Sequence, residues 1–183
     1  MPRHISFSRK FPATHPSKGN PTYFVEGILS QLGIDHLSYD YFMYLVNLNP
    51  DIDEVFLNKF IDSLFLGVRE KSHTIRAHKK PIKPGDIIIP VCWAGKPYNK
   101  TPEGYWQIKF APDIKIKKVF DITFVQKDEL LSIGDKNFYP YGYEETIEKL
   151  AYNDLLTDAE FKAWFQKPFT GTIICWNDKI DYL

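Results

Sequence analysis

The run GDIIIPVCWAG, residues 85–95, constrains the fold of this chain more than any other stretch. It is almost continuously apolar, as is typical of a buried strand, and the turn residues KPGD at 83–86 precede it. Three later runs also have β character: YWQIKF (105–110), IKIKKVFDITF (114–124) and GTIICW (171–176). The chain from His73 onward is therefore expected to be rich in strands, and a short first strand is expected at Ile5–Ser8.

Helical periodicity dominates residues 21–66 and returns before the last strand. The candidate N-terminal signals are Asn20 before Pro21, Ser38, either Asp51 or Asp53, and Thr157 with Glu160 as a capping box. Five or so strands joined by helices predict one α+β domain spanning 1–183. Its expected architecture is a small β-barrel of about five to seven strands decorated by helices.

Charge and composition exclude several classes of function. The 23 basic and 23 acidic residues cancel, so no net field draws the chain to nucleic acid or membrane. Local asymmetry remains, with twelve Lys/Arg against four Asp/Glu between Arg69 and Lys118. This asymmetry fits either a solvated face or a surface for a phosphate-bearing ligand. No signal peptide or membrane-spanning run is evident, and a cytoplasmic protein is expected.

Cys92 and Cys175 each precede a tryptophan in an apolar run and are expected to be buried strand thiols. Neither CxxC nor HExxH spacing occurs, and the histidines are scattered. Neither a metal site nor a cofactor is expected.

The stretch EKSHTIRAHKK, residues 70–80, concentrates groups that could do chemistry. Lys71 could act as a general base, Thr74 as a nucleophile and Arg76 as a fork for phosphate or an oxyanion. In a regular strand Lys71 and Thr74 would point to opposite faces, so their cooperation requires a turn between them. The alternative is an edge strand whose cations discourage aggregation.

A second candidate site is WAGKPYNKTPEGYW, residues 93–106. It interleaves aromatic residues with cations, chiefly Trp93, Lys96 and Tyr98, as do sites that stack single bases and neutralise their phosphates. The alternative is a tight hairpin whose aromatic rings pack on the core. A third candidate is Asp154, which could hold a lysine in place or instead form an ordinary Asx turn between two helices.

The blocks KSHTIR (71–76), KPGD (83–86), VCWAGKPY (91–98) and FAPDIKIKKVFDI (110–122) resemble the ASCH domains of the PUA-like superfamily. The closer resemblance is to an uncharacterised bacterial and phage branch of that family. It implies a small, partly open β-barrel that binds RNA or modified bases in a cleft at its mouth. The helical block at 36–66 lies outside the generic ASCH core and is expected to be an insertion.

One type of ASCH protein deacetylates acetylated cytidine, and a Lys-x-x-Thr pair with a glutamate is proposed to act there. Lys71 and Thr74 match that spacing, and Asp154 stands near the expected place of the acid. The resemblance thus implies Lys71, Thr74 and Asp154 as candidate catalytic residues. The candidate ligand-binding residues are Arg76, His73, Trp93, Lys96 and Tyr98.

Three hypotheses about function follow. The first is a module that binds RNA, single-stranded nucleic acid or a modified nucleobase in a basic cleft. The alternative is an amidohydrolase acting on an acylated nucleobase or nucleoside such as acetylcytidine. A third makes the insertion a partner or dimer surface, and the alternative, that its side chains pack on the core, explains them more simply. The residues concerned are Tyr39, Tyr41, Phe42, Met43 and Tyr44.

Overall fold

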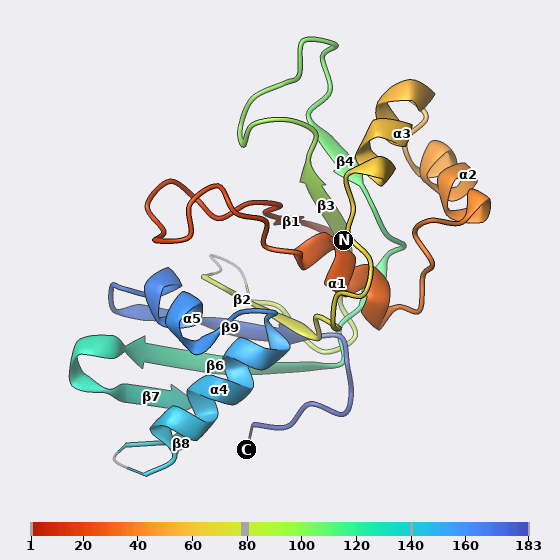
Figure 1. Ribbon diagram of the computed structural model, residues 1–183. Helices are drawn as coiled ribbons and strands as arrows, with labels where there is room; N and C mark the ends of the chain where they lie inside the picture. The colour runs from red at the N-terminus through yellow and green to blue at the C-terminus, as the bar shows by residue number, and fades with distance from the viewer. Residues whose placement is uncertain (1, 78–80, 140, 183) are drawn as a thin grey trace. The chain divides into compact units, whose positions relative to one another are not determined.

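The computed structural model describes residues 2–77, 81–139 and 141–182 (Figure 1). Within these residues the protein is α+β, with five α-helices and nine strands. The chain divides into two compact units. The first consists of Met1–Lys10, Pro21–Lys71 and Ile87–Ile114, and the second of Phe11–Asn20, Ser72–Asp86 and Lys115–Leu183. The single domain with an insertion at 36–66 remains a prediction.

The sheet of the first unit is built around β3 (Ile87–Trp93), the predicted buried strand. Strand β1 (Arg3–Phe7) runs parallel to β3, and β4 (Gln107–Lys109) pairs with it antiparallel. The short strand β5 (Ile114–Lys115) also pairs with β3. Cys92 of β3 is fully buried, as its apolar surroundings in the sequence predicted.

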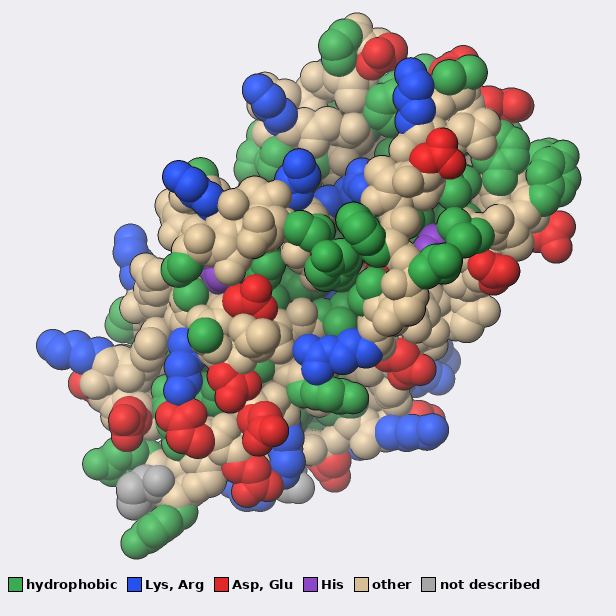
Figure 2. Space-filling model, viewed as in Figure 1, with side chains coloured by type: hydrophobic (Ala, Val, Ile, Leu, Met, Phe, Trp, Pro, Cys, Tyr) green, Lys and Arg blue, Asp and Glu red, His purple; other side chains and the backbone are tan. Residues whose placement is uncertain are grey.

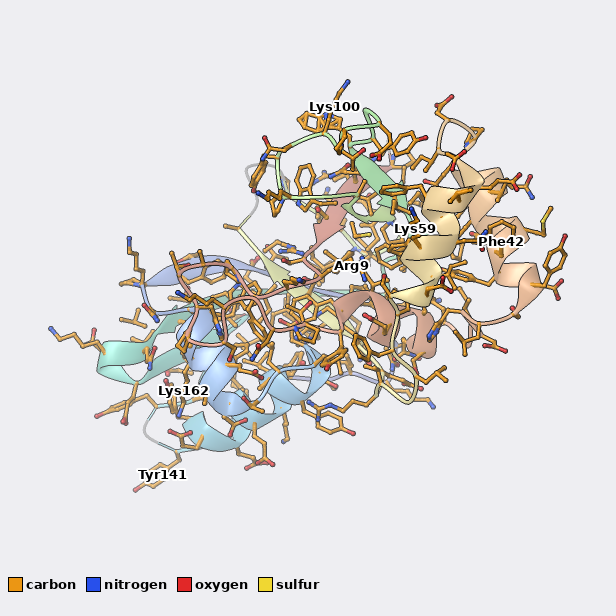
Figure 3. All side chains as sticks on the ribbon, turned by 45° about the horizontal axis from the view of Figure 1, so that its top comes forward. Arg9, Phe42, Lys59, Lys100, Tyr141 and Lys162 are labelled. Atoms are coloured by element: carbon orange, nitrogen blue, oxygen red, sulfur yellow. The ribbon has the colours of Figure 1, made fainter. Side chains whose placement is uncertain are left out.

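Three helices complete the first unit: α1 (Phe24–Gln31), α2 (Tyr39–Leu48) and α3 (Glu54–Asp62). Two of their predicted caps are confirmed. The Ser38 hydroxyl accepts from Tyr41 N, and the Asp53 carboxylate accepts from the backbone at the start of α3. Arg9, labelled in Figure 3, donates to Ser63 Oγ at 2.7 Å, next to the end of α3.

The predicted start of the first helix is wrong. Helix α1 begins at Phe24, and Tyr23 precedes it in the left-handed region at φ 57°. Pro21 instead forms a bridge with Lys10, and Thr22 N donates to Arg9 O at 3.0 Å. This extended pairing keeps the segment before Tyr23 out of helical geometry.

Of the two alternatives for Tyr41, core packing is confirmed and exposure on a partner surface is wrong. Its side chain is 3% exposed, and its hydroxyl donates to Phe110 O at 2.8 Å. Tyr39, by contrast, is 72% exposed. Helix α2 is therefore anchored through Tyr41, and the aromatic residues of this block do not form one continuous exposed surface.

The second unit contains a five-stranded antiparallel sheet in the order β2-β9-β6-β7-β8. Its strands are β2 (His73–Arg76), β6 (Lys118–Val125), β7 (Leu130–Ile133), β8 (Lys136–Asn137) and β9 (Phe169–Cys175), with a 3-10 turn at Gln126–Asp128. Cys175, at the end of β9, is buried as predicted.

Two helices of the second unit, α4 (Tyr143–Asn153) and α5 (Asp158–Trp164), lie together beside this sheet (Figure 1). Phe161 of α5 packs edge-on against Phe124 of β6, with ring centroids 5.9 Å apart. The predicted Thr157–Glu160 capping box opens α5. Neither of the two sheets closes on itself through pairings of the described strands, so the β-barrel remains a prediction.

Acidic side chains gather over α4 in the space-filling view (Figure 2). Glu145 pairs with Lys149, and Glu144 pairs with Lys162 of α5, each at 2.8 Å. The acidic face of α4 is therefore solvated and has counter-charges on α4 and α5. None of the helices within the described residues has the length and apolar character needed to span a bilayer.

Candidate functional site

The clearest candidate site in the first unit is the connection between β3 and β4, residues 93–106, here called the aromatic loop. The ring of Trp93 lies 4.9 Å from that of Tyr98 and 6.0 Å from that of Trp106, measured between centroids. Tyr98 is 79% exposed and Trp106 47% exposed. These rings form an exposed cluster, so the alternative in which they pack on the core does not hold for Tyr98 and Trp106.

The base of the aromatic loop is fixed by backbone pairing. Ala94 N donates to Trp106 O at 3.1 Å, and Thr101 N donates to Tyr105 O at 2.8 Å. The Tyr105 hydroxyl accepts from Asp53 N at 2.9 Å, which ties the loop to the start of α3. The exposed rings therefore stand on an anchored loop.

Two cations flank the aromatic cluster. Lys96 and Lys100 are both exposed, and Lys100 extends outward from the loop in Figure 3. Of the predicted binding residues in this loop, Trp93 and Tyr98 are in ring contact, and Lys96 is exposed on the same loop. Tyr98 adopts φ 63°, a conformation that costs a non-glycine residue about 1–2 kcal/mol. Substituting another L-residue there would not relieve this strain.

The segment at 70–80 is divided between the two units. Lys71 belongs to the first unit, where its N–H donates to Gly27 O at 2.9 Å. Its side chain is 1% exposed, and its ammonium lies 4.0 Å from the centroid of the Phe24 ring. Residues 78–80 lie outside the described residues, including two of the lysines in this stretch.

Thr74 and Arg76 belong to the second unit, on β2, which is an edge strand of its sheet. This position agrees with the predicted alternative of an edge strand, but the burial of its residues does not fit a strand of solvated cations. Thr74 is only 3% exposed, and its hydroxyl makes no hydrogen bond within the described part of the chain. Arg76, at the end of the strand, is half-buried. The strand therefore presents one shielded hydroxyl rather than a row of solvated cations.

His73 forms the centre of a buried polar cluster in the second unit. Its Nδ1 lies 2.7 Å from the Tyr182 hydroxyl, and its Nε2 lies 3.9 Å from Asp154 Oδ1. Asn153 Nδ2 donates to the same Tyr182 hydroxyl at 3.0 Å. Asp154 directly follows α4, and this position places its carboxylate beside the imidazole. The residue is 7% exposed.

The Tyr182 hydroxyl links His73 to Asn153. The Tyr182 oxygen accepts from Asn153 Nδ2 and shares a hydrogen bond with His73 Nδ1. Burial raises the pKa of Tyr182 far above its usual value, whereas the hydrogen bond from Asn153 lowers it, so the hydroxyl stays protonated and can donate.

His73 and Asp154 were candidate site residues from the sequence, whereas no sequence signal pointed to Tyr182, which lies 109 residues from His73. Among the described residues, no group of three or more His, Cys, Asp or Glu side chains could hold a metal ion.

No protein-family model matches this sequence, and neither a curated protein nor a solved structure is significantly similar to it.

Proposed function

We propose that the protein is an ASCH-type module of the PUA-like superfamily that binds RNA, single-stranded nucleic acid or a modified nucleobase, with the aromatic loop as a principal contact. The observation that supports this proposal is the exposed cluster of Trp93, Tyr98 and Trp106. The resemblance of the sequence blocks to ASCH domains supports it independently.

The chemistry of the aromatic loop suits a single strand better than a duplex. Each base offers a flat face, and stacking on an aromatic side chain contributes about 1–3 kcal/mol per base, whatever the sequence. Lys96 and Lys100 stand beside the rings and can each neutralise a phosphate. Because the chain has no net charge, nonspecific attraction to a duplex would be weak.

Fluorescence anisotropy with a labelled single-stranded RNA of about twelve nucleotides tests this proposal, since such a length fits the site sizes of single-strand binders. We expect saturable binding at low salt, weaker binding to a duplex of the same sequence, and quenching of tryptophan fluorescence on binding. Undetectable affinity for single-stranded RNA and DNA at low salt would sink the proposal.

A second candidate is an amidohydrolase that deacylates a nucleobase or nucleoside such as acetylcytidine. It is supported by the shielded Thr74 hydroxyl, which has no hydrogen-bond partner within the described residues, and by the buried Asp154. In this proposal the roles are those that the resemblance implies, with Thr74 as the nucleophile and Lys71 as the general base. Attack by the Thr74 oxygen on the acyl carbon breaks the C–N bond, the leaving nitrogen takes up the proton, and water then hydrolyses the acyl ester. Asp154 is the acid of the set, and Arg76 or a backbone N–H stabilises the oxyanion.

Hydrolysis of acetylcytidine, followed by absorbance, tests the second candidate. Thr74→Ala and Lys71→Ala should each abolish turnover, whereas Thr170→Ala, at an exposed position of β9, should leave it unchanged. Full activity in both site variants, or no turnover by the wild-type protein, would exclude this candidate and leave the binding proposal standing.

A further inference from the structure

A small cavity in the first unit contains polar groups that neither candidate function uses. Its volume is about 170 Å³. Glu26 and Ser30 of α1 line it, together with Asp35, His36 and the segment 65–68. No residue of the aromatic loop lines the cavity among those described, so the two sites can be tested separately.

Glu26 is the unusual group of this cavity. Its side chain is 5% exposed, and its carboxylate makes no hydrogen bond or ion pair with any described residue. Taking an unpaired carboxylate out of water costs several kcal/mol, so buried carboxylates normally have a cationic or hydrogen-bonding partner. The site therefore lacks a donor that a ligand could supply.

Three other polar side chains line the cavity beside Glu26. Ser30 follows Glu26 by one helical turn and lies on the same face of α1. His36 is 8% exposed, and its Nε2 has no hydrogen-bond partner among the described residues. Asp35 adds a second carboxylate, one oxygen of which accepts from Leu37 N at 3.1 Å. Neither lysine nor arginine is among the described residues that line the cavity.

The apolar wall suits an organic cation. Phe65 is half exposed, and its ring stands edge-on to that of Tyr23 at 5.2 Å between centroids. An aromatic ring beside carboxylates favours ammonium and guanidinium groups, because the ring face attracts a cation while the carboxylate accepts its hydrogen bonds. The carboxylates and imidazole of the described chain do not form a cluster suited to a metal ion.

Size restricts the ligand further. A volume of about 170 Å³ corresponds to roughly five or six water molecules and is below that of pockets for drug-sized ligands. We propose that this cavity binds a small organic cation through its ammonium or guanidinium group, with the Glu26 carboxylate as the main acceptor and Ser30 as a second one.

Isothermal titration calorimetry of the full chain with agmatine and putrescine tests this proposal. We expect binding by at least one of the two with a Kd below about 1 mM at low salt, and no binding of 4-guanidinobutyrate, whose carboxylate would meet Glu26 and Asp35. Glu26→Gln keeps the shape of the side chain but removes its charge. It should weaken binding by about tenfold or more, as expected for the loss of a charge-assisted hydrogen bond.

Matched variants separate ligand binding from folding. Asp62→Asn removes one exposed negative charge from the same unit and should leave affinity within about twofold of wild type. Ser30→Ala, which keeps the Glu26 charge, should weaken binding by about threefold to tenfold, and it serves as the test if Glu26→Gln fails to fold. Equal affinity in the wild type, Glu26→Gln and Ser30→Ala, or no heat with either cation at about 1 mM, would overturn the proposal.

Discussion

Replacing Tyr98 by alanine removes the most exposed ring of the aromatic loop and is the sharpest perturbation of the proposed binding surface. The ring is 79% exposed and contacts Trp93 at 4.9 Å between centroids. Stacking of one base contributes about 1–3 kcal/mol, so Tyr98→Ala should weaken binding of single-stranded RNA by about 5- to 150-fold.

The fold should tolerate this change. Alanine has the same Cβ as tyrosine, so the left-handed backbone at φ 63° is neither relieved nor further strained. Loss of one exposed aromatic contact should lower the free energy of unfolding by about 1 kcal/mol or less. A drop in RNA affinity can therefore be attributed to the missing ring.

Anisotropy titrations at one low salt concentration provide the assay. Tyr98→Phe should bind within about twofold of wild type, because stacking uses the ring and not the hydroxyl. Tyr141→Ala, at a tyrosine of the second unit that is 89% exposed, is the matched control and should also bind normally. If Tyr98→Ala also binds within twofold of wild type, the reasoning about stacking is refuted.

Three further predictions concern stability and can be checked by urea denaturation. Gly171→Ala would place a Cβ 2.5 Å from Arg76 O, so it should destabilise the protein by about 1–3 kcal/mol. The control Thr170→Ala, on the same strand, should cost less than about 1 kcal/mol. Equal stabilities of the two variants would contradict the close approach of β2 and β9. Tyr182→Phe leaves buried His73 Nδ1 without its hydrogen-bond partner and should cost about 1–3 kcal/mol, against about zero for Tyr141→Phe. Burial raises the pKa of Cys92 and of Cys175 from 9.0 to about 12, so between these values the folded state keeps protons that the unfolded state has lost. Stability should therefore fall as pH rises above about 9, approaching about 1.4 kcal/mol per pH unit for each thiol, and a flat profile up to about pH 10 would contradict this.

Local signals in the sequence predicted local structure well. Ser38, Asp53 and the Thr157–Glu160 box cap helices because their side chains act within one turn of their own position. The signal at Asn20 failed because Pro21 pairs with Lys10, and no local pattern reports a contact with a distant segment.

The difference between local and long-range contacts also explains which of the candidate sites could be predicted from the sequence. Trp93, Lys96 and Tyr98 lie within six residues, so the sequence alone could place them together. The cluster of His73, Asp154 and Tyr182 joins a strand, a helix end and the C-terminal segment, and only the tertiary fold brings these together. Glu26 left a fainter signal, since it is the one charged residue of the helix α1, FVEGILSQ.

The salt dependence of RNA binding tests the central claim most directly. Each phosphate neutralised by a lysine contributes about 0.7 to the slope of log affinity against log salt for a single strand. The account predicts that Lys96→Gln with Lys100→Gln weakens binding at low salt and reduces the magnitude of that slope by about 1.4. An unchanged slope in this double variant would contradict the proposal that the aromatic loop contacts the strand.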